Sequence, residues 1–206
     1  MTKVAVFAKA PVAGRVKTRL APLLGEEGAA ALHAGLVKRA LCTAVGSGVG
    51  AVELWCSPDA RHPFFESCAA QFRVALKEQS GADLGARMRN AFEASHAQGE
   101  PLLLIGSDCP VLGGPTLRSA AAALASSDAV FVPAEDGGYV LVGLARPAPR
   151  IFEGIGWGSG AVMMQTRARL AVEGVRWEEL ATHWDLDRPE DYARARAEGL
   201  LAGAPA

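Results

Sequence analysis

The chain has 206 residues, half of them hydrophobic, and its 21 basic and 22 acidic residues give a formal net charge of -1. Such a chain can bury one sizeable core, so we expect a single domain over residues 1–206. The balanced charge gives no broad basic field for nucleic acid and no acidic tail typical of disorder. The apolar runs are too short to span a bilayer and no signal peptide is evident, so we expect a cytoplasmic protein that binds neither membrane nor nucleic acid.

The first predicted strand, residues 4–8, is an apolar run with the length of one buried strand. Pro11 and Gly14 break the loop that follows, and three cations come next within five residues, namely Arg15, Lys17 and Arg19. In open α/β proteins, such a loop at the carboxyl end of a strand is typical of a phosphate site. A solvated basic turn explains the same residues equally well. The spacing matches neither a P-loop nor a dinucleotide-binding glycine motif.

Strands and helices alternate through the first half of the chain. Apolar residues recur at helical spacing over residues 26–45 and 83–97, and a shorter helix is expected over residues 59–72. Strand patterns occupy residues 52–56 and 73–79. This alternation predicts a parallel sheet with right-handed crossovers.

The strongest strand pattern is residues 102–105, which are apolar on both faces and therefore predict the centre of a covered parallel sheet. Asp108 follows it beside the small residues Gly106 and Ser107. The carboxyl end of a central strand is the usual place of a ligand site in an open α/β sheet. The alternative is that Asp108 caps the next turn or helix. We expect that helix over residues 116–125, several positions later.

A hairpin is expected from strands over residues 129–132 and 139–142, because the loop between them contains Asp136 and Gly137. A tight turn is the leading interpretation of this loop, although its glycines would also let backbone approach a ligand. Ser159 could be the N-cap of a helix over residues 161–172. Residues 175–180 form an edge strand or a helical turn, and an exposed edge could support a homodimer.

Two carboxylates, Asp185 and Asp187, stand close together near the end of the chain. Asp187 is followed by Pro189 and Glu190, which is the pattern of a capping box with proline in the first helical turn. Asp187 therefore has a complete structural explanation, whereas Asp185 has none. On an extended segment the two side chains would point to opposite sides.

Five sequence blocks, taken in their order along the chain, resemble those of a known bacterial family. The blocks are FAKAPVAGRVKTRLAP, GADLGARM, LLIGSDCP, PAEDGGYVLVGL and WDLDRPEDY. The family is that of the nucleotide-diphospho-sugar transferase-like proteins, also described as radical-SAM/selenodomain-associated transferases and arsenosugar-biosynthesis glycosyltransferases. It is similar to phospholactate and molybdenum-cofactor guanylyltransferases. The resemblance implies a GT-A type fold, a Rossmann-like α/β/α sandwich with a mostly parallel sheet.

The resemblance also implies where a nucleotide and a metal would bind. The first loop would hold the nucleotide's phosphates through Ala10, Gly14, Arg15, Lys17 and Arg19. The base or ribose would lie beside Gly81, Leu84 and Arg87. Asp108 would bind the metal and, by alignment to Pro189, Asp187 would be the second ligand, with Asp185 as its near neighbour. Arg15, Lys17 and Asp108 are the residues expected to be catalytic.

The second substrate would dock on the residues Glu135, Asp136, Gly137, Gly138 and Ser159. Gly158-Ser159-Gly160 departs from the Ser/Thr-Thr/Ser-Pro that is more usual in relatives, which weakens the implied role of Ser159. Carboxylates together with substrate phosphates are the usual ligands of Mg²⁺, and Mn²⁺ is the alternative cofactor.

The function that follows is a Mg²⁺-dependent transferase that binds a nucleoside triphosphate or a nucleotide-sugar. It would transfer a nucleotidyl or a glycosyl group to a small-molecule acceptor. The alternative is a non-catalytic nucleotide-binding module that serves a partner protein.

Overall fold

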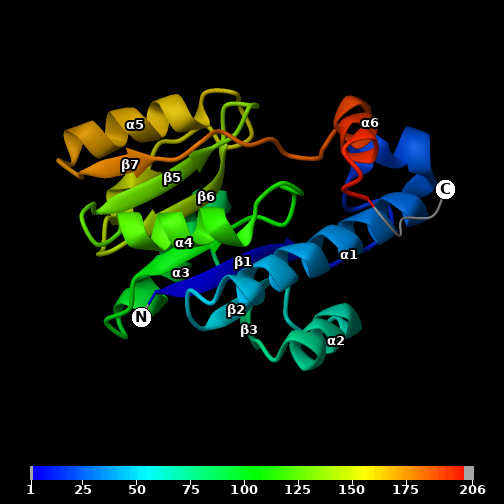
Figure 1. Cartoon of the computed structure of the whole chain (residues 1–206), viewed down its shortest axis with the longest axis horizontal. Helices are drawn as coiled ribbons and strands as arrows, with labels where there is room; N and C mark the ends of the chain where they lie inside the picture. The colour runs from blue at the N-terminus through cyan, green and yellow to red at the C-terminus, as the bar shows by residue number, and fades with distance from the viewer. Residues whose placement is uncertain (1, 202–206) are drawn as a thin grey trace.

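A computed structural model describes residues 2–201 of the chain (Figure 1). Its strands are β1 (Lys3–Lys9), β2 (Val52–Ser57), β3 (Ala75–Glu78), β4 (Leu102–Ile105), β5 (Ala129–Pro133), β6 (Tyr139–Leu144) and β7 (Trp177–Glu179). Its α-helices are α1 (Ala21–Ser47), α2 (Pro63–Phe72), α3 (Leu84–His96), α4 (Gly114–Ala123), α5 (Val162–Val172) and α6 (Pro189–Ala197). Two short 3-10 helices are η1 (Thr18–Leu20) and η2 (Pro149–Phe152).

One seven-stranded sheet runs through the molecule in the order β3-β2-β1-β4-β6-β5-β7. β6 is antiparallel to both β4 and β5, and the other four pairings are parallel. The carboxyl ends of β1, β4, β5 and β7 therefore lie at the same edge of the sheet, where β6 begins. This mostly parallel sheet between helices confirms the expected fold class.

Two apolar cores cover the two faces of the sheet, because side chains of β1 alternate between them. Val4 and Val6 belong to the core shared with α1, α2 and α4. Ala5 and Phe7 belong to the core shared with α3, η2 and α5. Burial on both faces explains why the strand sequences are continuous apolar runs.

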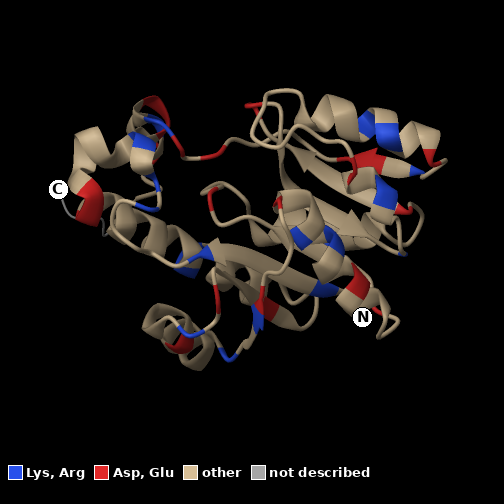
Figure 2. Cartoon of the chain, turned by 180° about the vertical axis from the view of Figure 1, so that it is seen from behind, with Lys and Arg blue, Asp and Glu red and all other residues tan. Residues whose placement is uncertain are grey.

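A third apolar cluster holds the end of the chain against the start of α1. After β7 the chain crosses to α6, which lies beside the first turns of α1 (Figure 1). Trp184 and Leu186 of the crossing segment pack there with Leu20 and Leu32. Figure 2 shows acidic positions along this segment and basic positions on the chain next to it. The cluster therefore fixes the predicted acidic motif over the carboxyl edge of the sheet.

Helix boundaries differ from the sequence-based expectation in two places. α2 begins at Pro63 instead of residue 59, because His62 is the N-cap and its Nδ1 accepts a hydrogen bond from the Phe64 N–H at 3.2 Å. α1 begins at Ala21, five residues before the expected start, and is interrupted at Gly25, whose φ of 72° is outside the helical range.

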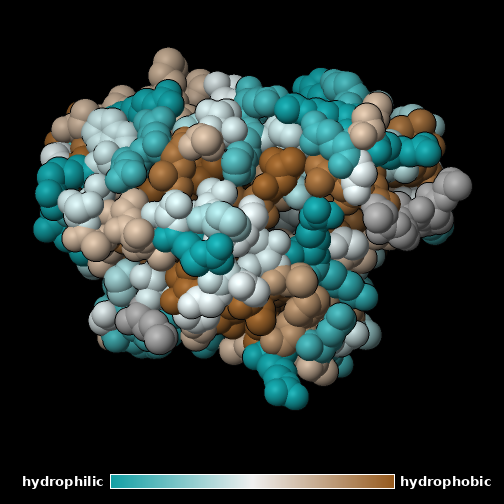
Figure 3. All heavy atoms as spheres, viewed as in Figure 1, coloured by the Kyte–Doolittle hydropathy of each residue, from teal (hydrophilic) through white to brown (hydrophobic). Residues whose placement is uncertain are grey.

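The surface carries separate apolar residues. Figure 3 shows hydrophobic residues in several separate places on one face, surrounded by hydrophilic ones. The most exposed large hydrophobic side chains of residues 2–201, Met164 and Val172, both belong to α5. Across residues 2–201, no helix has both the length and the apolar composition needed to cross a bilayer.

Candidate functional site

The buried ammonium of Lys17 lies at the centre of the site. Its backbone adopts a left-handed φ of 48°, which non-glycine residues seldom adopt, and only 3% of its side chain is exposed. Nζ lies 2.8 Å from Asp108 Oδ1 and donates a hydrogen bond to the Leu186 carbonyl at 2.6 Å. Because a buried charge needs partners, Lys17 joins the first loop to the loop after β4 and to the segment before α6.

Asp108 faces the solvent side of this ion pair, and 46% of its side chain is exposed. Burial alone would raise the pKa of Asp108, but the charges of Lys17 and His33 outweigh it and hold that pKa well below its usual value. The Asp108 carbonyl accepts a hydrogen bond from the Leu186 N–H at 2.8 Å. Asp108 is therefore an ionised carboxylate fixed through both its backbone and its side chain. It does not cap α4, because Gly113 occupies the N-cap position.

His33 of α1 lies next to the Asp108 carboxylate. Its Nε2 lies 3.0 Å from the Lys9 carbonyl, which can only accept, so Nε2 carries a hydrogen. Nδ1 faces Asp108 Oδ1 at 3.8 Å, beyond hydrogen-bond distance. The imidazole is buried, bonded to the end of β1 and packed beside the Asp108 carboxylate.

Asp187 has a different environment from the one that the capping pattern predicts. The N-cap of α6 is Arg188, and the Asp191 carboxylate accepts from the N–H groups of Arg188 and Asp187 at 2.8 and 3.1 Å. The Asp187 carboxylate instead pairs with Arg19 and lies 3.7 Å from the Lys17 ammonium. The predicted capping box of Asp187 and Glu190 is therefore wrong, and Asp187 faces the cations of the first loop.

Asp185 lies between two other acids because the segment after β7 continues along the carboxyl edge of the sheet. The His183 carbonyl accepts from the Glu135 N–H at 2.9 Å, and Leu186 binds the Asp108 carbonyl. Burial, together with the charges of Asp108 and Asp136, raises the pKa of Asp185 to about 7. Asp185 is therefore the carboxylate of this edge whose charge is least compensated by the protein's own cations.

A cavity of about 650 Å³ brings the predicted phosphate and metal residues together. The predicted site residues that line it are Arg15, Lys17, Arg19, Leu84, Arg87, Asp108 and Asp187. Gly14 and Gly81 do not line it. Gly81 has a φ of 140°, and a Cβ there would lie 2.7 Å from the Arg87 backbone nitrogen, so the start of α3 requires glycine at this position.

A second cavity of about 250 Å³ opens beside the first and shares Phe7, Leu84 and Gly106 with it. The predicted site residues that line it are Asp136, Gly138, Ser159, Asp185 and Leu84. The rings of Tyr139 and Trp157 form another part of its wall, with their centroids 6.4 Å apart.

Two residues predicted to bind the acceptor do not line this second cavity. The Glu135 carboxylate pairs with the Arg194 guanidinium of α6 at 2.9 Å. Gly137 has a φ of 89°, and a Cβ there would lie 2.0 Å from the Gly160 carbonyl oxygen. Gly137 thus lets the hairpin loop pack on the loop before α5.

Ser159 is not the N-cap of α5 as expected, because Ala161 occupies that position and the Ser159 hydroxyl donates to the Gly156 carbonyl at 2.7 Å.

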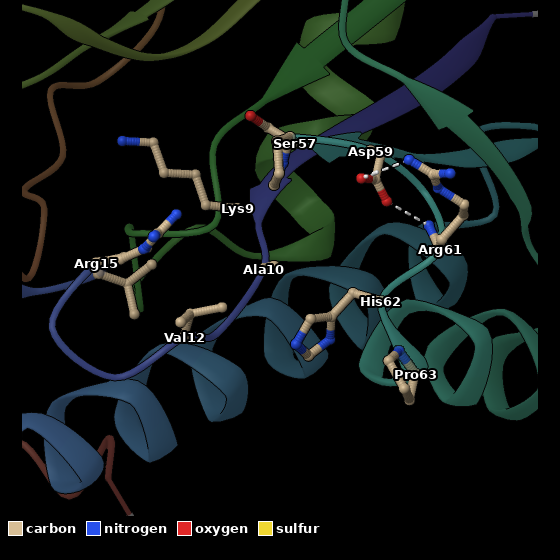
Figure 4. Close-up of a pocket in the computed structure, with 11 residues that line it drawn as sticks. Lys9, Ala10, Val12, Arg15, Ser57, Asp59, Arg61, His62 and Pro63 are labelled. Carbon is tan, nitrogen blue, oxygen red and sulfur yellow. Dashed lines mark hydrogen bonds and ion pairs between the residues drawn. The ribbon is translucent and has the colours of Figure 1, made fainter.

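A further cavity of about 520 Å³ lies between the first loop and the segment after β2 (Figure 4). Lys9, Ala10 and Arg15 line it from the first loop. Arg61 lines the other side, where its guanidinium lies 3.3 Å from Asp59. Since Lys9 and Arg15 also line the 650 Å³ cavity, the two spaces adjoin, and Ala10 lies on the outer one.

A family model described as "Uncharacterized protein conserved in bacteria (DUF2064)" matches residues 40–159, more than half of the chain. The chain belongs to the DUF2064 family. No curated protein sequence matches it.

Solved structures match this DUF2064 chain over almost its whole length. A protein from Desulfovibrio desulfuricans G20, provisionally named a nucleotide-diphospho-sugar transferase, is 29% identical with a TM-score of 0.88, covering 98% of this chain and 90% of that one. A nucleotidyl transferase from Methanothermobacter is 18% identical with a TM-score of 0.62, covering 97% and 98%. CMP:2-keto-3-deoxy-manno-octonic acid synthetase in complex with CTP is 13% identical with a TM-score of 0.59, covering 97% and 98%. The DUF2064 chain therefore has the GT-A-like fold of nucleotide-diphospho-sugar transferases.

Lys9, Thr18 and Ser107 line the 650 Å³ cavity within motifs that the sequence analysis singled out, although it gave them no role. Sequence reasoning missed two further polar residues that this DUF2064 chain places there, His33 and Gln79. Gln79 Nε2 donates to the carbonyls of Trp55 and Ala8 at 2.8 and 3.3 Å, which fixes the amide at the ends of β1 and β2. Neither residue belongs to a recognisable motif. The available signal was position alone: Gln79 follows a strand, and His33 falls on the apolar face of α1.

Proposed function

We propose that this DUF2064 protein is a Mg²⁺-dependent transferase that binds a nucleoside triphosphate or nucleotide-sugar and transfers a nucleotidyl or glycosyl group to a small acceptor. One observation carries the proposal. The cations of the first loop and the carboxylates of two distant segments line one cavity at the carboxyl edge of the sheet, and a second cavity opens from it. The names of structural relatives, which include a nucleotidyl transferase and a synthetase bound to CTP, support it.

In this proposal the first loop binds the phosphates. Lys17 is held in place by Asp108 and Leu186, so its charge is positioned before a nucleotide arrives. Arg15 and Arg19 are exposed and would close on the outer phosphate oxygens. Such preorganised cations stabilise the negative charge that develops on the leaving pyrophosphate or nucleoside diphosphate.

Gln79, Leu84 and Arg87 line the part of the same cavity that is formed by the end of β3 and the start of α3. Arg87 donates to the Ser57 hydroxyl and the Gly81 carbonyl at 3.2 and 3.3 Å, so its guanidinium is already fixed. We assign this side of the cavity to the base and ribose of the nucleotide.

Asp108 and Asp185 are the carboxylates that fit a divalent cation best. The charges of Asp108, Asp136 and Asp187 all raise the pKa of Asp185, and an added cation would offset this repulsion. Asp187 pairs with Arg19 and Asp108 with Lys17, whereas no Lys, Arg or His among residues 2–201 forms an ion pair with Asp185. Within residues 2–201, no group of three or more His, Cys, Asp or Glu side chains is placed to hold a metal ion by itself. Mg²⁺ needs none, because substrate phosphates and water complete its shell, and it supplies charge neutralisation at the transferred phosphate.

The acceptor would bind in the second cavity, which meets the first at Phe7, Leu84 and Gly106. In nucleotidyl transfer the acceptor oxygen attacks the α-phosphorus and pyrophosphate leaves. In glycosyl transfer it attacks the sugar and the nucleoside diphosphate leaves.

The test is a panel of nucleoside triphosphates and nucleotide-sugars, each incubated with the protein with and without Mg²⁺. We expect one nucleotide class to raise the melting temperature in a Mg²⁺-dependent way. We then expect pyrophosphate release, or diphosphate release with loss of the sugar, once an acceptor is supplied. Stabilisation without turnover over a broad acceptor panel would favour the non-catalytic binding module. No stabilisation by any nucleotide would refute the proposal.

A further inference from the structure

The second cavity differs sharply in charge from the first. Its wall is mainly apolar and aromatic, with Phe7, Tyr139 and Trp157 among its residues. Its acidic lining residues are Asp136 and Asp185, and of the residues that the structure describes no Lys, Arg or His lines it. The adjoining cavity is lined by five Lys and Arg residues, together with His33, Asp108 and Asp187. The five are Lys9, Arg15, Lys17, Arg19 and Arg87.

The nearest cations are already engaged elsewhere. The Lys17 ammonium contacts Asp108 and the Leu186 carbonyl, and the Arg87 guanidinium contacts Ser57 and Gly81. Arg194 pairs with Glu135 outside the cavity. An anionic group that entered the second cavity would therefore meet carboxylates without a counter-charge, which is unfavourable in a partly buried space.

The two polar side chains whose hydrogen bonds are fixed at this wall can both accept hydrogen bonds. Asp136 Oδ1 accepts from the Gly138 N–H at 2.9 Å, and Oδ2 has no partner among residues 2–201. The Ser159 hydroxyl donates its hydrogen to the Gly156 carbonyl at 2.7 Å, and its oxygen accepts from the Ala161 N–H at 3.4 Å, which leaves one further acceptor position. Asp136 and Ser159 therefore favour a ligand with hydrogen-bond donors, which hydroxyl and amine groups have and ionised phosphate and carboxylate groups lack. The Tyr139 hydroxyl is buried without a hydrogen-bond partner among residues 2–201, and it can donate as well as accept.

We propose that the second cavity binds a small acceptor that carries no anionic group, a hydroxyl- or amine-bearing molecule with one apolar face. This inference rests on the proposed function, because it names the acceptor class of that transferase. The apolar face would pack on Trp157, and the donors would face Asp136 and Ser159. The volume of about 250 Å³ is slightly below the usual range of about 300–1,000 Å³ for drug-sized ligands, so the acceptor is about the size of a single ring.

This acceptor class excludes a phosphate as the attacking group. The electrostatic argument does not depend on metal occupancy, because Asp136 keeps the wall negative even when a cation neutralises Asp185. The cation-rich first loop is thus used for the nucleotide alone, and the two substrates are separated by charge.

The experiment measures binding of three single-ring probes, benzyl alcohol, benzylamine and phenyl phosphate, by calorimetry and ligand-observed NMR. Mg²⁺ and inorganic pyrophosphate are present in excess to fill the cationic cavity. We expect benzyl alcohol and benzylamine to bind at least tenfold more tightly than phenyl phosphate. The isosteric variant Asp136→Asn should weaken benzylamine about tenfold and narrow the gap to phenyl phosphate. The matched control Glu66→Gln removes an exposed carboxylate of α2 that lines neither cavity and should change no affinity.

Three results would overturn the inference: phenyl phosphate binding as tightly as the other probes, none of the three binding, or equal affinities in Asp136→Asn and the parent. Because the probes need no nucleotide and no turnover, this outcome is independent of the nucleotide panel. If no nucleotide binds but the three probes bind with the expected order of affinities, the transferase proposal is refuted. The second cavity would then remain a binding site for neutral or cationic single-ring molecules.

Discussion

Replacing Lys17 by Met tests whether the buried ammonium holds the site together. Met has a similar length and the same backbone constraints, so the left-handed φ of 48° is affected little, while the charge is lost. We expect Lys17→Met to lower the free energy of unfolding, because the Asp108 carboxylate and the Leu186 carbonyl both lose their partner. Asp108 would then also face Asp185 and Asp187 without the charge of Lys17.

The size of the effect follows from the distance and the exposure. Two unit charges 2.8 Å apart attract by about 1.5 kcal/mol in water and about 6 kcal/mol at an effective dielectric constant of about 20. Since 46% of the Asp108 side chain is exposed, solvent screening brings the pair toward the lower value, and we expect a coupling energy of about 2 kcal/mol. The lost hydrogen bond to the Leu186 carbonyl adds about 1 kcal/mol to the single variant.

The assay is a double-mutant cycle with Lys17→Met, Asp108→Asn and their combination, measured by urea unfolding at pH 7. Lys77→Met, which removes an exposed lysine of β3 whose side chain forms no ion pair or hydrogen bond among residues 2–201, is the control and should change stability by less than about 0.5 kcal/mol. A coupling energy below about 0.5 kcal/mol would show that the pair is screened and that Lys17 does not organise the site.

Three further predictions concern other parts of the molecule. Asp185→Asn should weaken Mn²⁺ binding, followed by electron paramagnetic resonance, at least tenfold, whereas Asp187→Asn should weaken it less; the reverse order would assign the metal to Asp187. Gly137→Ala should lower the free energy of unfolding by about 2 kcal/mol or more, since its Cβ would overlap the Gly160 carbonyl, and an unchanged melting temperature would contradict this. Burial raises the pKa of Asp128, but hydrogen bonds from Arg176 and Arg146 outweigh burial and lower that pKa. The stabilisation of the folded state by the Asp128 carboxylate is therefore present above about pH 4 and is lost as the pH falls through the lowered pKa. The stability of the parent and of Asp128→Asn should differ by about 1–2 kcal/mol at pH 6 and converge near pH 2, and a constant gap would refute the role of the charge.

The fold was predictable because its strands are buried on both faces. Residues 102–105 read as a central strand and form β4 with the same bounds, since a run of four apolar residues has no other stable place in a covered sheet. The hairpin of β5 and β6 was predictable from the Asp136-Gly137 turn. These patterns are local, so sequence reveals them.

The roles of the acids before α6 were not predictable in the same way. Asp187, Glu190 and Asp191 all fit an N-terminal helix pattern, and a shift of one residue decides which carboxylate caps the helix. The shift is set by tertiary contacts, namely Lys17 and Arg19 drawing Asp187 toward the first loop. His33 was missed for the same reason, because its contact with Asp108 depends on how α1 lies across the sheet.

The order of the strands explains why charge is divided between the two cavities. The loops that follow β1, β2 and β3 lie over one half of the carboxyl edge and supply the cations, including Arg15 and Arg61. The loops that follow β4, β5 and β7 lie over the other half and supply Asp136 and Asp185. The halves meet where β1 pairs with β4, and there the Lys17–Asp108 ion pair joins them. A group that leaves a polyphosphate for an acceptor without an anionic group would cross this boundary, so the sheet order would place the two proposed substrates on opposite sides of the reacting atoms.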